Sequence, residues 1–163
     1  MNNIEIVSPD PWTISPKVRL LSYKDDYGLE YEDLGEWRMN SPLGGKVFLN
    51  EIKSKKRYTI FNQAGYPFVW QTDGNRLAIP LWIVRHAEDE DEGDVIFQRL
   101  GVVDADAKTL TIYSKQFKVV QVSLFDGDTI AGVDSPRYEP VSFNFDIKSE
   151  AVESVITLSI INQ

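Results

Sequence analysis

Few residues of this chain belong to the types that carry covalent or metal chemistry. The chain has no cysteine and one histidine, His86. A cysteine nucleophile, a disulfide and a thiolate metal site are therefore excluded, and a zinc site would lack the further histidine or cysteine ligands that it needs. No Gly-x-Ser-x-Gly motif accompanies His86, so a Ser-His-Asp triad is not indicated. The sequence predicts no catalytic residue, no metal site and no cofactor.

Phosphate and nucleic-acid chemistry is also poorly supported. Gly44-Gly45-Lys46 lacks the four-residue spacer and the hydroxyl of a P-loop. The net charge of −8 argues against nucleic-acid binding, because phosphate contacts need clustered Lys and Arg. No apolar run approaches the roughly 20 residues that span a bilayer, and the first residues do not resemble a signal peptide. We expect a cytoplasmic protein with neither a nucleic-acid nor a membrane partner.

An acidic run is the strongest local signal. Glu88-Asp89-Glu90-Asp91-Glu92 is followed closely by Asp94. An EF-hand that starts at Glu88 would place Arg99 at position twelve, where a bidentate Glu is required. Three interpretations stay open: a looser calcium loop, a solvated hairpin tip that prevents edge-to-edge strand pairing, or a charged surface that steers a basic partner.

A second group of acids lies in residues 25–36. With the acids of residues 88–94 it accounts for 12 of the 25 acidic residues, whereas residues 46–57 are rich in lysine. Alternation is expected to project Glu30, Glu32 and Glu36 from one strand face. The predicted partner-binding residues are Glu88, Asp89, Glu90, Asp91, Glu92, Asp94, Asp25, Asp26, Glu30, Glu32, Asp33, Glu36 and Trp37.

The elements that must position these residues are β-strands. Apolar residues do not recur with helical spacing, and short β-branched and aromatic runs are separated by Gly, Pro, Asn and Asp. The strict alternation in residues 141–147 is the clearest example. Strands are predicted over Val18–Tyr23, Leu29–Tyr31, Glu36–Met39, Lys46–Leu49, Arg57–Phe61, Phe68–Gln71, Arg76–Val84, Val95–Val103, Thr109–Tyr113, Phe117–Phe125, Thr129–Val133, Val141–Ile147 and Val152–Ile161.

Turn residues indicate how these strands connect. Asp73-Gly74 and Asp126-Gly127 are predicted hairpin turns in which Gly supplies a positive φ. The acidic run is predicted to form the tip between Arg76–Val84 and Val95–Val103. Residues 151–161 could also form a short helix, but their β-branched content favours a strand. We expect one all-β domain over residues 1–163, an antiparallel meander that forms a sandwich or open barrel.

Two segments share an Asp-Gly turn, then two residues, an aliphatic residue and Ala: Trp70–Ile79 and Leu124–Val133. Residues 68–84 and 100–133 resemble the hairpins of TolB-type β-propeller blades. The resemblance implies partial propeller-like blades as the alternative fold. It implies no fixed activity.

These features together predict a binding protein rather than an enzyme. The specific hypothesis is an acidic, bacterial immunity-type inhibitor that occludes a basic protein partner. The first alternative is an accessory domain of a larger assembly, which would dock through aromatic residues such as Tyr27, Tyr31, Trp37 and Tyr66. The second is a carbohydrate-active enzyme with paired carboxylates, for which Asp25 and Glu36 are candidates.

Overall fold

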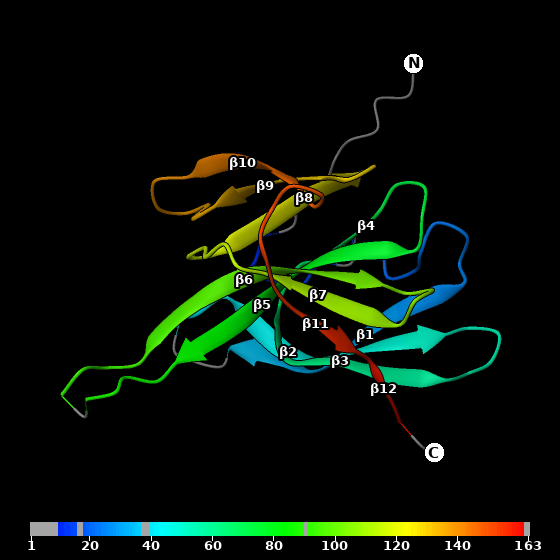
Figure 1. Ribbon diagram of the computed structural model, residues 1–163, viewed down its shortest axis with the longest axis horizontal. Helices are drawn as coiled ribbons and strands as arrows, with labels where there is room; N and C mark the ends of the chain where they lie inside the picture. Colours follow the sequence, from blue (N-terminus) through cyan, green and yellow to red (C-terminus); the bar gives the residue numbers. More distant parts are fainter. Residues whose placement is uncertain (1–9, 16–17, 37–39, 90, 162–163) are drawn as a thin grey trace.

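The structure is a computed structural model that describes residues 10–15, 18–36, 40–89 and 91–161. All regular structure in these residues is β-strand, which confirms the predicted all-β class (Figure 1). The strands are β1 (Tyr27–Glu36), β2 (Leu43–Glu51), β3 (Arg57–Gly65), β4 (Val69–Trp70), β5 (Arg76–Arg85), β6 (Val95–Asp104), β7 (Thr109–Tyr113), β8 (Val120–Asp126), β9 (Thr129–Asp134), β10 (Val141–Asp146), β11 (Val152–Thr157) and β12 (Ser159–Ile160).

The strands form one large antiparallel sheet and one small one. The large sheet has the order β1-β2-β3-β5-β6-β7-β11, with β4 paired to β5 and β12 paired to β3. It curls without closing into a barrel. β3 and β5 are joined through a single pair, Ala64 with Leu81. The small sheet has the order β10-β9-β8 and lies above the large sheet in Figure 1.

A first hydrophobic core fills the concave side of the large sheet. Alternate residues of β5, Leu77, Ile79 and Leu81, are buried there with residues of β1, β2, β3 and β7. Gly101 of β6 lies where an added Cβ would meet the side chains of Leu81 and Leu110 at 2.8 and 3.0 Å. A side chain at position 101 would therefore force these two buried leucines to shift.

A second core lies between the large sheet and the small sheet. The intervening residues of the large sheet, including Ala78, Leu100 and Val102, are buried there against Phe125 and Phe145 of the small sheet. Strands β5, β6 and β7 are thus a central layer with both faces covered. This explains why β5 and β6 are almost continuously apolar instead of alternating.

Two buried glutamines attach the small sheet to the central layer. The side chain of Gln98 accepts a hydrogen bond of 2.5 Å from the backbone N–H of Val120, and its own backbone exchanges two hydrogen bonds of 2.8 Å with Phe117. The side chain of Gln71 donates to the carbonyl of Gly127 at 2.7 Å. Each glutamine satisfies a backbone polar group of the small sheet, which is fully buried at Val120 and lies in the exposed turn at Gly127.

Most predicted strands are present, with differences at the ends. β7 has the predicted bounds, the ambiguous C-terminal segment is strand, and the hairpin between β5 and β6 is confirmed. The predicted strand Val18–Tyr23 is wrong: of its described residues only Leu21 forms an isolated bridge, with Gly28. Leu29–Tyr31 and the described end of Glu36–Met39 belong to one strand, β1, whose ladder is interrupted by a bulge after Glu32.

The two Asp-Gly turns differ from each other. Gly127 has φ 56° at the first position of a two-residue loop, as predicted. Gly74 does not have a positive φ, so the predicted reason for its glycine is wrong. The Gln71 side chain occupies the space that a Cβ of residue 74 would need. Close packing, and not backbone conformation, explains this glycine.

Candidate interaction surfaces

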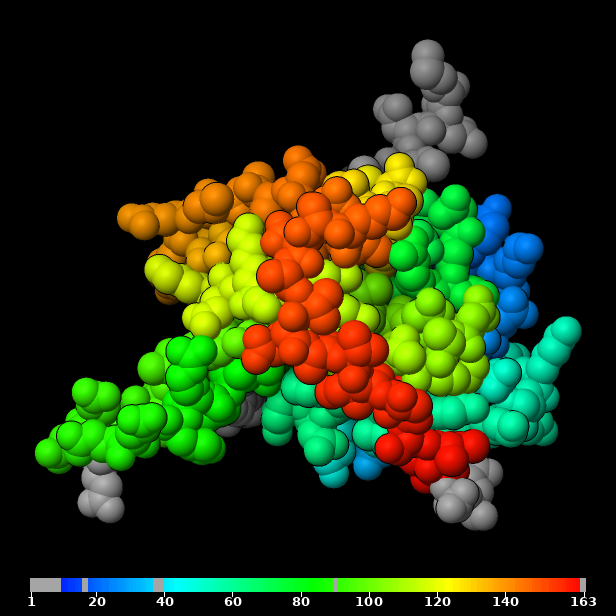
Figure 2. Space-filling model, in the orientation of Figure 1, coloured from blue at the N-terminus to red at the C-terminus, as the bar shows by residue number. Residues whose placement is uncertain are grey.

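The acidic run forms the tip of a hairpin that extends from the body of the molecule. Strands β5 and β6 stay paired in continuous register up to Arg85 and Val95, and the tip follows (Figure 1). We call residues 85–95 the acidic finger. In the space-filling view it is the green extension at the left (Figure 2). Within the tip, Asp89 organises the turn, because its side chain accepts a 3.3 Å hydrogen bond from the N–H of Asp91.

The carboxylates of the finger are exposed and mostly uncompensated. In the described part of the finger, only Asp94 lies close to a basic side chain, the imidazole of His86, with Nδ1 at 3.3 Å. No ion pair within the described residues involves the four other acids found there: Glu88, Asp89, Asp91 and Glu92. Glu90, also predicted as a site residue, lies outside the described residues. The finger therefore presents unpaired negative charge to solvent.

The acids of residues 25–36 have a different environment. Glu30 and Glu32 lie 3.4 and 3.5 Å from the guanidinium of Arg57, which confirms that they share one face of β1. Arg57 in turn lies over the Phe48 ring, with 3.8 Å from its Cζ to the ring centroid. Asp25 pairs with Arg19 at 3.5 Å. Two arginines therefore offset part of the charge of the six acids in this group.

The structure does not gather the two acid groups into one surface. β1 is an edge strand, and β2 and β3 lie between it and β5. Asp25 and Asp26 precede β1 while Glu36 ends it, roughly 30 Å away at about 3.3 Å per residue. Asp25 and Glu36 are thus too far apart to act as a glycosidase pair, which needs about 5 to 10 Å. Glu36 accepts a hydrogen bond from Asn40 N–H at 3.4 Å, and Asp33 is exposed in the bulged part of β1.

The aromatic docking surface predicted for an accessory domain is not present as expected. Tyr27 and Tyr66 are only 7% and 4% exposed and belong to the core. Tyr31 is partly buried, and its hydroxyl donates to the carbonyl of Gly65 at 2.6 Å. Trp37 lies outside the described residues. The tyrosines fill space inside the sheet because alternation along β1 places both Tyr27 and Tyr31 on its inner face.

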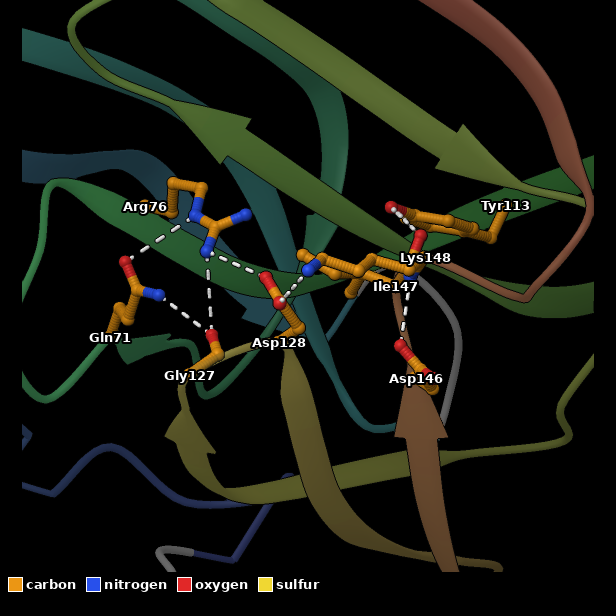
Figure 3. Close-up of polar contacts among 8 residues, drawn as sticks. All are labelled: Gln71, Arg76, Tyr113, Gly127, Asp128, Asp146, Ile147 and Lys148. Carbon is orange, nitrogen blue, oxygen red and sulfur yellow. Dashed lines mark hydrogen bonds and ion pairs between the residues drawn. The ribbon is translucent and has the colours of Figure 1, made fainter.

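A polar cluster joins the turn of β8 and β9 to the large sheet (Figure 3). Arg76 and Lys148 each lie 3.0 Å from a different carboxylate oxygen of Asp128. The hydrogen bonds from Lys148 and then Arg76 lower the pKa of the Asp128 carboxyl. Both oxygens of Asp128 are occupied by cations, so this cluster is a clamp between layers and offers no free carboxylate for catalysis.

A second polar contact joins Tyr27 of β1 to Asp106 in the loop after β6. The hydroxyl of Tyr27 donates a 2.8 Å hydrogen bond to Asp106, which also accepts from Asn75 at 3.2 Å. Burial raises the pKa of the Tyr27 hydroxyl well above its usual value, and the hydrogen bond to Asp106 raises it further. Lys108 lies 3.4 Å from the same hydroxyl. This group ties the loop after β6 to β1.

One aromatic groove does open on the surface. Its volume is about 540 Å³, and Trp12, Lys118, Arg137 and the well-exposed Tyr138 are among the lining residues. Arg137 lies over the Trp12 ring at 4.0 Å and pairs with Asp10 at 3.1 Å. The sequence does not reveal this groove, because Trp12 and Arg137 are 125 positions apart and only the fold brings them together.

Neither a metal-ligand cluster nor a helix able to span a membrane is found in the described residues. Among them, no three His, Asp or Glu side chains are arranged to hold a metal ion. No helix long and apolar enough to cross a bilayer occurs in those ranges. No protein-family model, curated protein or solved structure matches this chain. The resemblance of residues 68–84 and 100–133 to propeller-blade hairpins stays a prediction.

Proposed function

We propose that this chain is a non-catalytic protein-binding domain whose acidic finger engages a basic protein partner. The observation that carries the proposal is the finger itself. It projects from the body, and Glu88, Asp89, Asp91 and Glu92 lie on it without compensating cations among the described residues. A projecting hairpin can enter a concave basic surface that a flat acidic patch could not reach. An immunity-type inhibitor that covers the active surface of a basic toxin would use such a shape.

The energetics favour fast association over a large intrinsic affinity. Exposed charges attract a complementary surface over about one Debye length, roughly 8 Å at physiological ionic strength. Complementary potentials raise association rates from about 10⁵–10⁶ to as much as 10⁸–10⁹ M⁻¹s⁻¹ at low salt. Association through the finger should therefore slow steeply as salt is added, while dissociation changes little.

The test compares two variants with the same change in net charge. The finger variant carries Glu88→Ser, Asp91→Ser and Glu92→Ser, and it keeps Asp89 because that side chain organises the turn. The control variant carries Asp73→Ser, Glu139→Ser and Glu150→Ser, whose side chains lie outside the finger. Partners are captured from a native lysate on the immobilised wild-type chain, identified, purified, and measured against each variant across a salt series.

We expect the finger variant to reduce the association rate by at least tenfold and to flatten its salt dependence. The association rate of the control variant should fall much less, because charges more than about one Debye length from the contact are screened by salt. Both variants should unfold within about 0.5 kcal/mol of the wild type, as exposed substitutions usually do. Equal losses in the two variants, or no loss in either, would refute binding through the finger.

A further inference from the structure

Two loops meet at the end of the large sheet that lies away from the acidic finger. Residues 20–26 lead into β1, and residues 52–56 connect β2 to β3. The N–H of Ile52 donates to the carbonyl of Asp26 at 3.0 Å, so the loops are in direct contact. In Figure 1 both loops lie at the right, whereas the finger extends to the left. We call residues 20–26 and 52–56 together the lysine end.

The hydrogen bonds of Tyr27 give the same placement. Tyr27 follows the first loop, and its hydroxyl donates to Asp106 at 2.8 Å. Asp106 lies just beyond Asp104, the last residue of β6, whereas the finger adjoins Val95 at the other end of that strand. The length of β6 therefore separates the lysine end from the finger.

Large apolar side chains are exposed at the lysine end. Four of them are between 39% and 55% exposed: Leu20, Leu21, Tyr23 and Ile52. Leu21 and Ile52 come from different loops but lie side by side, because their methyl carbons are 3.3 and 3.7 Å from the point where a Cβ of Gly28 would stand. Exposed apolar side chains that gather in this way mark a surface that binds a partner or a membrane.

The same two loops carry exposed lysines that lack an opposite charge. These are Lys24, Lys53, Lys55 and Lys56, and no ion pair within the described residues involves them. The acids of the loops are Asp25, which lies 3.5 Å from Arg19, and the half-buried Asp26. The lysine end therefore has a net charge of +2 in a chain whose net charge is −8.

A bilayer surface with anionic lipids matches this combination of groups. Its negative potential attracts lysines, and apolar side chains of a surface-bound element insert about 5–10 Å into the boundary of its hydrocarbon. Lysine stems can follow those side chains while the ammonium groups stay among the headgroups. A folded acidic protein would need a fitted pocket for each exposed side chain, whereas hydrocarbon accepts all of them. The combination favours a bilayer over a protein.

We propose that the lysine end binds the surface of a bilayer that contains anionic phospholipids, with Leu20, Tyr23 and Ile52 inserted at the level of the headgroups. The expectation of no membrane partner rests on the lack of a spanning segment, which a protein bound at the surface does not need. The inference goes beyond the proposed function and does not depend on it. The anionic surface would repel the acidic finger, so the finger would point away from the bilayer.

The test measures co-sedimentation of the whole chain with sucrose-loaded vesicles. One set of vesicles holds two parts of phosphatidylcholine to one part of phosphatidylserine, and the other holds phosphatidylcholine alone. We expect binding to the first set that weakens as salt is added, because the potential of the surface falls off within a Debye length. Binding to the second set should be at least about tenfold weaker.

Two variants with the same change in net charge test the lysines. The lysine variant carries Lys24→Gln, Lys53→Gln and Lys56→Gln, and it keeps Lys55, whose φ is 59°. The control carries three changes at exposed lysines outside the lysine end: Lys46→Gln, Lys115→Gln and Lys118→Gln. One lysine near the surface is worth about fivefold in affinity, so the lysine variant should bind about 100-fold more weakly. The control should lose less than about threefold.

A second pair of variants tests the apolar side chains. Leu20→Thr with Ile52→Thr should weaken binding about 5- to 20-fold, because both side chains are half exposed and would enter the bilayer. Val141→Thr with Val155→Thr is the control, since these valines are 63% and 62% exposed on other strands. All four variants should keep the urea midpoint of the wild type, because the substituted side chains are exposed.

The absence of cysteine allows a single fluorescent label to report orientation. Ile52→Cys and Glu92→Cys are each labelled with a nitrobenzoxadiazole, whose emission shifts to the blue in an apolar environment. Vesicles should shift the emission of the label at residue 52 and leave that at residue 92 unchanged.

Several results would overturn the proposal. These are equal affinity for the two sets of vesicles, equal losses in the lysine variant and its control, a blue shift at residue 92 instead of residue 52, or no binding at millimolar lipid. Sedimentation without vesicles that shows a dimer lost in both the lysine variant and the finger variant would assign the lysine end to the finger of a second copy. The finger variant should bind vesicles at least as tightly as the wild type, so failure of the lysine end and failure of the finger are distinguishable.

Discussion

Replacing Gln98 by leucine tests the seam between the two sheets. Gln98 is 1% exposed and Val120 is fully buried, and the 2.5 Å hydrogen bond between them satisfies the Val120 N–H. Leucine has a similar size but no acceptor. A buried N–H left without an acceptor costs about 1–3 kcal/mol, so the free energy of unfolding should fall by that amount.

The assay is equilibrium unfolding in urea, followed by tryptophan fluorescence. With a slope of about 2 kcal/mol per molar urea, the expected loss lowers the midpoint by about 0.5–1.5 M. Gln63→Leu is the matched control, since Gln63 is exposed on β3 and should change stability by less than about 0.5 kcal/mol. Gln98→Glu keeps an oxygen acceptor but buries a carboxyl, whose pKa should rise.

The stability of the Gln98→Glu variant should depend on pH in one direction. A carboxyl whose pKa is raised in the folded state is neutral there at low pH. As the pH rises above the ordinary glutamate pKa of about 4.3, the carboxyl ionises more readily in the unfolded chain, so the free energy of unfolding falls. The stability of Gln98→Glu should therefore approach that of the wild type near about pH 4 and be clearly lower at about pH 7.

The leucine variant decides the role of Gln98. If the free energy of unfolding of Gln98→Leu lies within about 0.5 kcal/mol of that of the wild type, Gln98 is not a required hydrogen-bond acceptor.

Two further predictions concern the titrating groups. Because its pKa is raised, Tyr27 keeps its proton in the folded state, whereas the same tyrosine ionises above about pH 10 in the unfolded chain. Above that pH, this one group should lower the free energy of unfolding by about 1.4 kcal/mol per pH unit. Tyr27→Phe should reduce that slope, as measured by urea midpoints between about pH 9 and 11. The lowered pKa of Asp128 has the opposite sign: its contribution is present above about pH 4 and is lost as pH falls further. Asp128→Asn should be less stable than the wild type at neutral pH, but its free energy of unfolding should fall less as the pH is lowered. If the free energies of unfolding of both proteins fall in parallel with pH, Asp128 does not form the stabilising clamp with Arg76 and Lys148.

Strand identity could be predicted from the sequence where one face of a strand is wet. Residues 141–147 alternate strictly, and β10 covers Val141–Asp146 with Phe145 buried in the second core. The hairpin that carries the finger was also predictable, because acids separate two long apolar runs. Prediction failed at Val18–Tyr23, which meets the start of β1 through one isolated bridge, Leu21 with Gly28, and two backbone hydrogen bonds instead of forming a strand.

The layers and the surfaces depend on contacts that leave no local pattern. Nothing near Gln71 or Gln98 in the chain indicates that each would bond a backbone group of the small sheet. The acids Glu30 and Glu32 look like a free patch until β3 places Arg57 beside them. Periodicity reports which face of a strand is buried, but not which distant strand buries it or which cation lies opposite.

The acidic finger extends from strands that are packed on both faces. β5 and β6 are held on both faces up to about Trp82 and Phe97, and beyond that point they continue as a free pair. Such a hairpin is anchored at one end in a layer that is packed on both faces. At its root, the indole N–H of Trp82 donates to the carbonyl of Leu43 at 3.3 Å. We therefore expect a force or a bound partner at the tip to change the fluorescence of Trp82.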